Sequence, residues 1–200
     1  MLEYYSEAIV LNKEALNDTD GLIYFYTEQF GKVIAKAKGL RRILSKSNPH
    51  LEPLSFVKIR LINNKNGYFQ LIDALSDKEN LKKIKGNQES LIKHLRIINF
   101  IDDMTFEFQP DLLLWQVIKE IIKRDLDEFQ AYQLILKVSG FNPEFSQCAV
   151  CSNKNTFYFN KVDNEFLCLK CSLPAFKTAK NADLIKIRSS QSNFERSQKI

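Results

Sequence analysis

All four cysteines of the 200-residue chain lie in one stretch, and their spacing is that of a metal site. They form two Cys-x-x-Cys pairs, Cys148 with Cys151 and Cys168 with Cys171, separated by sixteen residues. Each pair can place two thiolates on one side of a tight turn, and zinc takes four ligands in a tetrahedron. Because four protein ligands leave no open coordination position, we expect one structural Zn²⁺. Iron–sulfur ligation and metal-free thiols are the alternatives.

The residues between the two pairs predict how the four thiols meet. Segments 156–160 and 165–169 are rich in aromatic and aliphatic residues and flank turn-forming residues at 161–164. This pattern predicts a hairpin that returns the second pair of cysteines to the first, as in a zinc ribbon.

Basic residues concentrate in a different part of the chain. The whole sequence has 29 basic and 24 acidic residues, whereas segment 31–65 has nine Lys/Arg and one acid, Glu52. Lysines that bind phosphates, beside exposed tyrosines such as Tyr24, Tyr26 or Tyr68 that stack on bases, would form a single-strand-binding surface. The alternative is that these are solvated strand faces, or an edge that lysines protect against pairing.

Five short strands are expected before residue 80, at 4–16, 22–27, 31–39, 54–62 and 67–73. In the third, Lys32 and Lys36 alternate with Val33 and Ala35, which is the period of a strand with one buried face. Such a series predicts a small closed barrel of the OB-fold type, and an open sheet also fits.

Helices are expected to follow the strands. A capping box at 76–79 starts the first, which ends at Gly86, and apolar residues between 91 and 101 mark the second. Pro110 fits the first position of the third, and the fourth runs from 128 to 139. We expect Trp115 and residues 112–114 in the core. The fold class is α+β, with an OB-fold domain at 1–79, a helical domain at 80–146 and 174–200 with a polar tail, and the cysteine module at 147–173.

Several function classes lack their motifs. The sequence has no P-loop, nucleophile elbow, metalloprotease motif or dinucleotide fingerprint. Asp102 and Asp103 are the weak basis for an alternative metal-dependent nuclease, and a helix end explains them more simply. No signal peptide or bilayer-length apolar run is visible, so we expect a cytoplasmic protein without membrane association, whose thiols stay reduced.

Two ordered sets of motifs give the chain a resemblance to a known family. The first is Asp18-Thr-Asp-Gly-Leu-Ile-Tyr-Phe-Tyr-Thr27, followed by Gly31-Lys32, Ala35-Lys-Ala-Lys-Gly39 and Leu51-Glu-Pro53. The second is Gly140-Phe-Asn-Pro143, which leads into the two cysteine pairs. From about residue 4 to 172 the sequence resembles RecO, the bacterial recombination mediator family.

The resemblance implies an OB-fold, a helical domain and a zinc module in a protein without enzymatic activity. It implies a role in DNA repair, in which the protein binds single- and double-stranded DNA and anneals complementary strands. It also implies that the protein works with RecR to load RecA on nucleoid DNA coated by single-stranded-DNA-binding protein, and that it binds the C-terminal tail of that coating protein. A nucleic-acid adaptor acting on RNA is the other alternative. By position, the DNA-contacting role falls on eight basic residues: Lys32, Lys36, Lys38, Arg41, Arg42, Lys46, Lys58 and Arg60.

Overall fold

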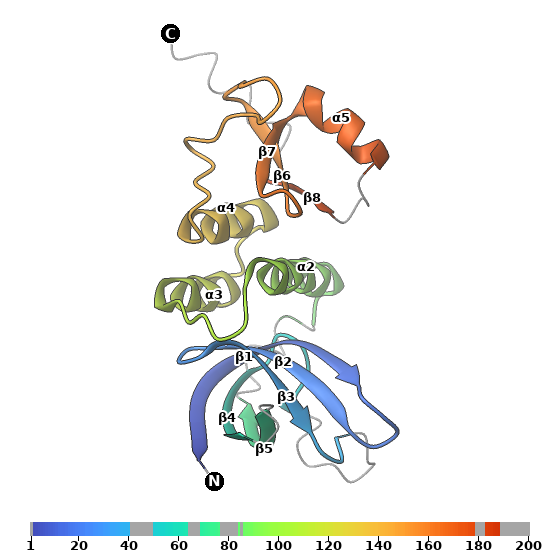
Figure 1. Cartoon of the computed structure of the whole chain (residues 1–200), viewed down its shortest axis with the longest axis vertical. Helices are drawn as coiled ribbons and strands as arrows, with labels where there is room; N and C mark the ends of the chain where they lie inside the picture. Colours follow the sequence, from blue (N-terminus) through green and yellow to red (C-terminus); the bar gives the residue numbers. More distant parts are fainter. Residues whose placement is uncertain are drawn as a thin grey trace. The chain divides into compact units, whose positions relative to one another are not determined.

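The computed structural model describes residues 2–40, 50–63, 69–76, 84, 86–178 and 183–188, without the side chains of 174–178 (Figure 1). Within it the chain forms two compact units, Met1–Asp125 and Leu126–Ile200. The helix expected from the capping box at 76–79 and the polar tail from 189 onward lie outside the described residues. The domain boundaries at 79, 146 and 173 stay a prediction.

The first unit is built on a closed five-stranded barrel (Figure 1). Its strands are β1 (Glu3–Ala15), β2 (Gly21–Thr27), β3 (Gly31–Ala37), β4 (Phe56–Asn63) and β5 (Phe69–Ser76). The order around the barrel is β1-β2-β3-β5-β4, with β3 and β5 parallel and the other pairs antiparallel. The long β1 pairs with β4 through its first half and with β2 through its second, so one strand serves both sides of the closure. This is the OB-fold expected from the sequence.

The alternation read from the sequence sets the barrel core. Val33, Ala35 and Ala37 are buried, and Lys32 and Lys36 between them are only half-buried, on the outer face. β4 repeats the pattern, with buried Val57, Ile59 and Leu61. Both assignments are therefore confirmed. β5 runs from Phe69 to Ser76, three residues past the predicted end at 73, and residues 67 and 68 lie outside the described residues.

Two longer helices follow the barrel in the described part of the first unit. α2 (Gln88–Met104) begins after Asn87, whose side chain accepts hydrogen bonds from the N–H groups of residues 89 and 90. Its buried face consists of Ser90, His94, Ile97, Ile98, Phe100 and Ile101. The stripe expected from residue 91 onward is only partly right, because the side chain of Ile92 is 43% exposed.

The third predicted helix, α3 (Leu112–Arg124), begins later than expected. Asp111 is its N-cap, with a side chain that accepts from the N–H groups of Leu113 and Leu114, so Pro110 precedes the cap instead of opening the helix. Trp115 and Leu114 are buried as predicted, but Leu112 and Leu113 are each 55% exposed. Three consecutive helical residues span roughly 200° around the axis. They therefore cannot all join the stripe that continues through residues 118, 121 and 122.

α3 and the loop before it are attached to the barrel by specific contacts. The ring of Phe56 packs edge-on against Trp115, with centroids 6.0 Å apart. The hydroxyl of Tyr26 donates to the carbonyl of Asp111 at 3.4 Å and accepts from its N–H at 3.3 Å. Burial raises the pKa of Tyr26 to about 12, so its hydroxyl keeps its proton at neutral pH.

The second unit holds the cysteines. It contains α4 (Glu128–Val138), β6 (Thr156–Asn160), β7 (Glu165–Cys168), α5 (Leu169–Thr178) and β8 (Leu184–Lys186). The hairpin β6–β7 confirms the prediction, and β8 adds an unpredicted third strand on the other side of β6. α4 contacts this sheet region, since Gln133 Nε2 donates to the carbonyl of Ile187 at 2.7 Å.

Candidate metal centre and nucleic-acid surface

The four cysteines come together as the sequence predicts. All four Sγ atoms lie within 4.8 Å of one another, and those of Cys151 and Cys168 are 3.7 Å apart. A zinc–sulfur bond of about 2.3 Å in a tetrahedron places sulfurs roughly 3.8 Å apart. The cluster therefore has a donor set and a spacing that fit a tetrahedral thiolate-bound metal ion.

Two different local structures position the two pairs. The first is a turn in which Cys148 accepts a hydrogen bond at its carbonyl from the N–H of Ser152, which has a positive φ of 58°. The N–H of Ala149 ties this turn to β7 by donating to the carbonyl of Phe166. The second pair spans the end of β7 and the first turn of α5, because Cys168 is the last strand residue and Cys171 the third of the helix. The β6–β7 pairing of Thr156 with Cys168 fixes that end of the strand.

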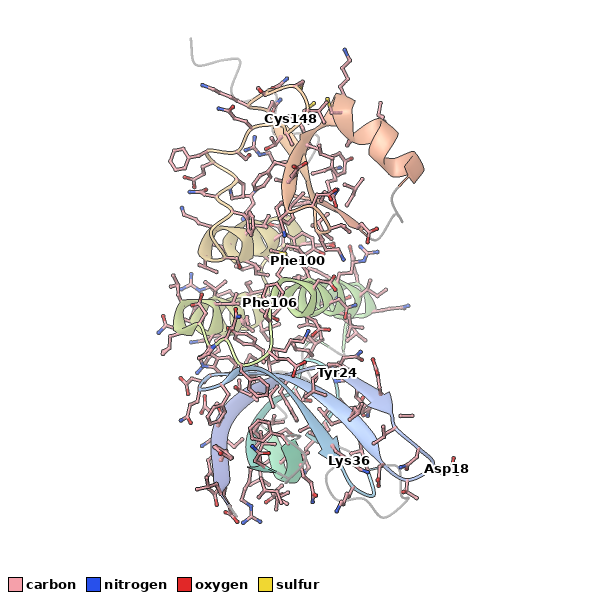
Figure 2. All side chains as sticks on the ribbon, in the orientation of Figure 1. Asp18, Tyr24, Lys36, Phe100, Phe106 and Cys148 are labelled. Carbon is pink, nitrogen blue, oxygen red and sulfur yellow. The ribbon has the colours of Figure 1, made fainter. Side chains whose placement is uncertain are left out.

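The surroundings of Cys148 favour its thiolate form, even without a bound metal ion. Burial raises the pKa of Cys148, but backbone N–H groups directed at its sulfur, led by that of Cys168, outweigh this and lower the pKa to about 6. Hydrogen bonds with Cys168 and Cys151 raise the pKa of Cys171 to about 12. Neighbouring sulfurs resist a second negative charge, so a bound cation is what would allow all four to ionise. Cys148, which is labelled in Figure 2, and Cys168 are buried, whereas Cys151 is exposed, so one side of the cluster faces solvent.

Two of the predicted DNA-contacting lysines are held by carboxylates of the same unit. Lys32 Nζ lies 2.6 Å from Asp102 Oδ1 at the end of α2 and donates to the Asp102 carbonyl at 2.9 Å. Lys36, labelled on β3 in Figure 2, lies 2.9 Å from Asp20 Oδ2. The N–H of Gly39 and the Lys36 ammonium hold the pKa of Asp20 well below its usual range. A phosphate would have to compete with both carboxylates.

The other predicted basic residues divide into two groups. Lys38 and Lys58 are exposed on the barrel, and Arg60 Nη1 approaches Glu3 Oε2 only to 3.8 Å. Arg41, Arg42 and Lys46 lie outside the described residues. The structure thus brings Lys58 and Arg60 together on the outer face of β4, whereas Lys36 and Lys38 lie along and just beyond β3.

The tyrosines named from sequence do not serve equally as stacking surfaces. Tyr26 is fully buried, and Tyr24 is half-buried with its hydroxyl donating to Glu14 at 3.0 Å. Tyr68 lies outside the described residues. Tyr5, which the sequence analysis did not single out, is 59% exposed and pairs with Arg60 across β1 and β4.

A pocket beside β4 adds residues that the sequence analysis missed. It has a volume of about 590 Å³ and includes Lys58 together with Lys119 and Lys123 of α3. The segment around α3 has more acidic than basic residues, so its net charge did not indicate a basic surface. Lys119 and Lys123 are four residues apart, however, and therefore lie on the same side of the helix. Periodicity could have grouped them with each other, but not with Lys58.

The barrel region and most of the chain are similar to known proteins. Residues 1–76 match the family model described as "Recombination protein O N terminal". The chain is 26% identical over 181 residues to the DNA repair protein RecO of Thermoanaerobacter sp. (strain X514), covering 86% of this chain and 72% of that protein. It is 25% identical to the RecO protein of Bacillus subtilis (strain 168) and 27% identical to that of Bacillus velezensis, with 82% of this chain and 67% of each relative covered.

The chain is similar to RecO proteins. The match to the RecO N-terminal model ends at Ser76, which is also the last residue of β5, so it covers the barrel strand for strand. In the described part of the chain, no helix combines the length and apolar character that crossing a membrane requires.

Proposed function

We propose that this protein is a recombination mediator in DNA repair that makes and breaks no covalent bond. It binds single- and double-stranded DNA and anneals complementary strands. With RecR it helps load RecA onto DNA coated by single-stranded-DNA-binding protein, through that protein's C-terminal tail. The observation that carries the proposal is the RecO N-terminal match, which coincides with a closed barrel whose outer faces present Lys38, Lys58 and Arg60.

The barrel supplies the interactions that mediator activity needs. Cations on a strand face attract phosphates without regard to sequence, and a mediator has to act on any sequence. Exposed rings such as that of Tyr5 offer a surface on which bases stack. The role of Asp102 as partner of Lys32 argues against the nuclease alternative, because a carboxylate paired at 2.6 Å is poorly placed to hold a catalytic Mg²⁺.

We propose that the cysteine cluster holds one structural Zn²⁺, with Cys148, Cys151, Cys168 and Cys171 as its ligands. The four-sulfur donor set and its spacing support a soft, tetrahedral ion. Four protein ligands leave no position for a substrate or water, so its contribution is to the folding of the module.

Annealing of two complementary strands, each coated with single-stranded-DNA-binding protein, tests the proposed function. The chain should accelerate annealing, and a free peptide with the acidic C-terminal sequence of that coating protein should suppress the acceleration by competing for the same site. A Lys38→Glu, Lys58→Glu double variant should lose single-strand affinity and show a shallower salt dependence.

A matched control distinguishes exposed cations from paired ones. Lys32→Gln removes the same kind of charge from a position already neutralised by Asp102, so it should change single-strand affinity less than Lys58→Gln does. The placement of the DNA surface would be wrong if the double variant bound DNA like the unmodified chain. The mediator assignment would be wrong if the chain failed to anneal coated strands.

A further inference from the structure

The pocket of about 590 Å³ on the outer side of the barrel has walls from four elements of the first unit. Its lining residues come from β1, β4, the end of β5 and α3: Glu7, Ala8, Phe56, Val57, Lys58, Leu75, Ser76, Lys119 and Lys123. Pockets that hold small ligands have volumes of roughly 300–1,000 Å³, so the space is sufficient for the base and sugar of a nucleotide.

The charge of the pocket selects an anion. Among the described residues, three lysines line it, and Glu7 is the one acidic lining residue. Lys119 Nζ lies 3.4 Å from Glu7 Oε2 and 5.5 Å from the centroid of the Trp115 ring, which fixes one ammonium at the rim. Lys58 and Lys123 are both exposed and add two further positive charges. The described lining of the pocket therefore carries an excess of positive charge.

The remaining lining is apolar. Phe56 of β4 and Leu75 of β5 contribute hydrophobic surface, and Leu75 is 62% exposed. A nucleotide combines an anionic phosphate with a flat, largely apolar base, and binding sites for single strands pair cations with apolar or aromatic surface for this reason.

The surface next to the pocket also places a positive charge beside an apolar or aromatic side chain. On the β1–β4 ladder, Glu7 lies opposite Lys58, and the pair two residues further along, Tyr5 opposite Arg60, places an exposed ring beside a guanidinium. A polynucleotide presents phosphate and base at every step, so it requires cation and apolar surface in repetition. An acidic peptide has no such requirement, and the repetition favours a nucleic-acid strand.

We propose that this pocket takes one nucleotide of a bound single strand. Lys58 and Lys123 contact its phosphates, Leu75 and Phe56 face its base, and Tyr5 with Arg60 contacts the adjoining nucleotide. This inference rests on the proposed DNA binding and shifts the path of the strand from β3, where Lys32 and Lys36 are paired with carboxylates, to the side of the barrel that α3 adjoins.

Lys123→Gln is the variant that tests the phosphate contact, and Arg124→Gln is its matched control. Arg124 is the next residue of α3, but it does not line the pocket and pairs with Glu120 at 2.6 Å. Affinity for a fluorescent oligothymidylate is measured by anisotropy over a series of salt concentrations. Loss of one phosphate contact should reduce the salt slope by about 0.7 and weaken binding about fivefold at 0.1 M salt. Arg124→Gln should bind like the unmodified chain.

Leu75→Ala tests the base contact. Because Leu75 is largely exposed, its truncation should leave the barrel folded. It should weaken binding of oligothymidylate and leave binding of an abasic strand of the same length unchanged, because the abasic strand has phosphates but no bases.

Three results separate the possibilities. If Lys123→Gln and Arg124→Gln bind DNA equally, the pocket is not on the path of the strand. If Lys123→Gln keeps its DNA affinity but loses affinity for a glutamate-rich peptide, the occupant is an acidic protein segment and the inference is overturned. If the unmodified chain binds no single strand, the proposed function itself fails.

Discussion

His94 is a titratable residue whose environment could not be predicted from the sequence. It is fully buried in α2, where Nδ1 lies 2.8 Å from the Ser90 carbonyl oxygen, and Nε2 lies 3.5 Å from Asp125 Oδ1. Burial and the nearby Lys93 lower the pKa of His94, and this outweighs the opposite effects of Ser90 and Asp125. The folded protein therefore favours the neutral imidazole.

This shift predicts a loss of stability on acidification. Above the ordinary histidine pKa of about 6.5 both folded and unfolded chains hold His94 neutral, and below it only the unfolded chain takes up the proton. The free energy of unfolding should therefore fall as the pH drops below about 6.5, until the folded pKa is reached. Lys93 holds the pKa of Asp125 below its usual range, so Asp125 stays ionised in this window. Urea midpoints between pH 7 and pH 5.5 should decline less in His94→Gln, and equal declines would contradict the assignment.

Sequence reasoning found the residue types of both candidate sites but not all their partners. Two Cys-x-x-Cys pairs predicted the cluster because each pair is set by local turn geometry. The partners of Lys32 and Lys36 could not be predicted in the same way. Asp102 is 70 residues from Lys32 along the chain, and the register of β2 and β3 is what brings Lys36 near the Asp20 turn.

At the level of elements, Gly31 at the start of β3 allows the loop between α2 and α3 to pack closely against that strand. Gly31 has a φ of +67°, and a Cβ added there would lie 2.3 Å from the carbonyl oxygen of Gln109. The N–H of Phe108 also donates to the carbonyl of Lys32 at 3.0 Å, so the loop backbone runs against the strand. The sequence suggested a tight turn at Gly31, but not that a distant loop occupies the space of its missing side chain.

Gly31→Ala should destabilise the first unit by two additive effects. A left-handed backbone costs a residue with a side chain about 1–2 kcal/mol, and crowding against backbone that cannot move aside costs about 1–3 kcal/mol more. Gly140→Ala is the control, because Gly140 also has a positive φ, of 91°, but no atom of the described residues lies within 4 Å of the added Cβ. Opening free energies from peptide-resolved hydrogen exchange should fall more in β3 of the first variant than around residue 140 of the second. Equal losses would show that the contact with Gln109 contributes nothing.

Strands were easier to predict than helix faces for a physical reason. A strand of this barrel has one face in the core, so alternation at period two identifies its buried residues directly. A helix buries only the arc that its neighbours cover, and the sequence does not say how wide that arc is. This explains why Val33 and Ala35 were correctly assigned while Ile92, Leu112 and Leu113 were not.

On the scale of the whole molecule, the two candidate sites belong to different compact units. The described residues of the proposed DNA surface all lie in Met1–Asp125, and the four cysteines lie in Leu126–Ile200. The sequence separated the basic segment from the cysteines correctly. The pocket beside β4 could not be predicted, because its walls come from segments that are distant in the chain and meet only in the fold.

This separation predicts that metal removal has different effects on stability and on DNA binding. Structural zinc contributes about 10–16 kcal/mol of apparent binding energy in small modules, comparable to the total stability of about 5–15 kcal/mol of a folded domain. The purified chain should contain about one zinc ion, since four thiolates complete one tetrahedron. A chelator, or Cys151→Ser, should abolish hydrogen-exchange protection in β6, β7 and α5 and leave that of the barrel strands in place.

Binding of oligothymidylate, measured on the same samples, completes the test. If the strand binds the barrel and the pocket at α3, affinity should change less than about twofold when the metal is removed, because none of the described DNA-contacting residues lies in the cysteine unit. Chelator already saturated with zinc serves as the control for direct effects of the reagent. Full protection of β6, β7 and α5 without metal would refute the structural role of the ion. A parallel loss of DNA affinity would instead place part of the DNA surface in the second unit.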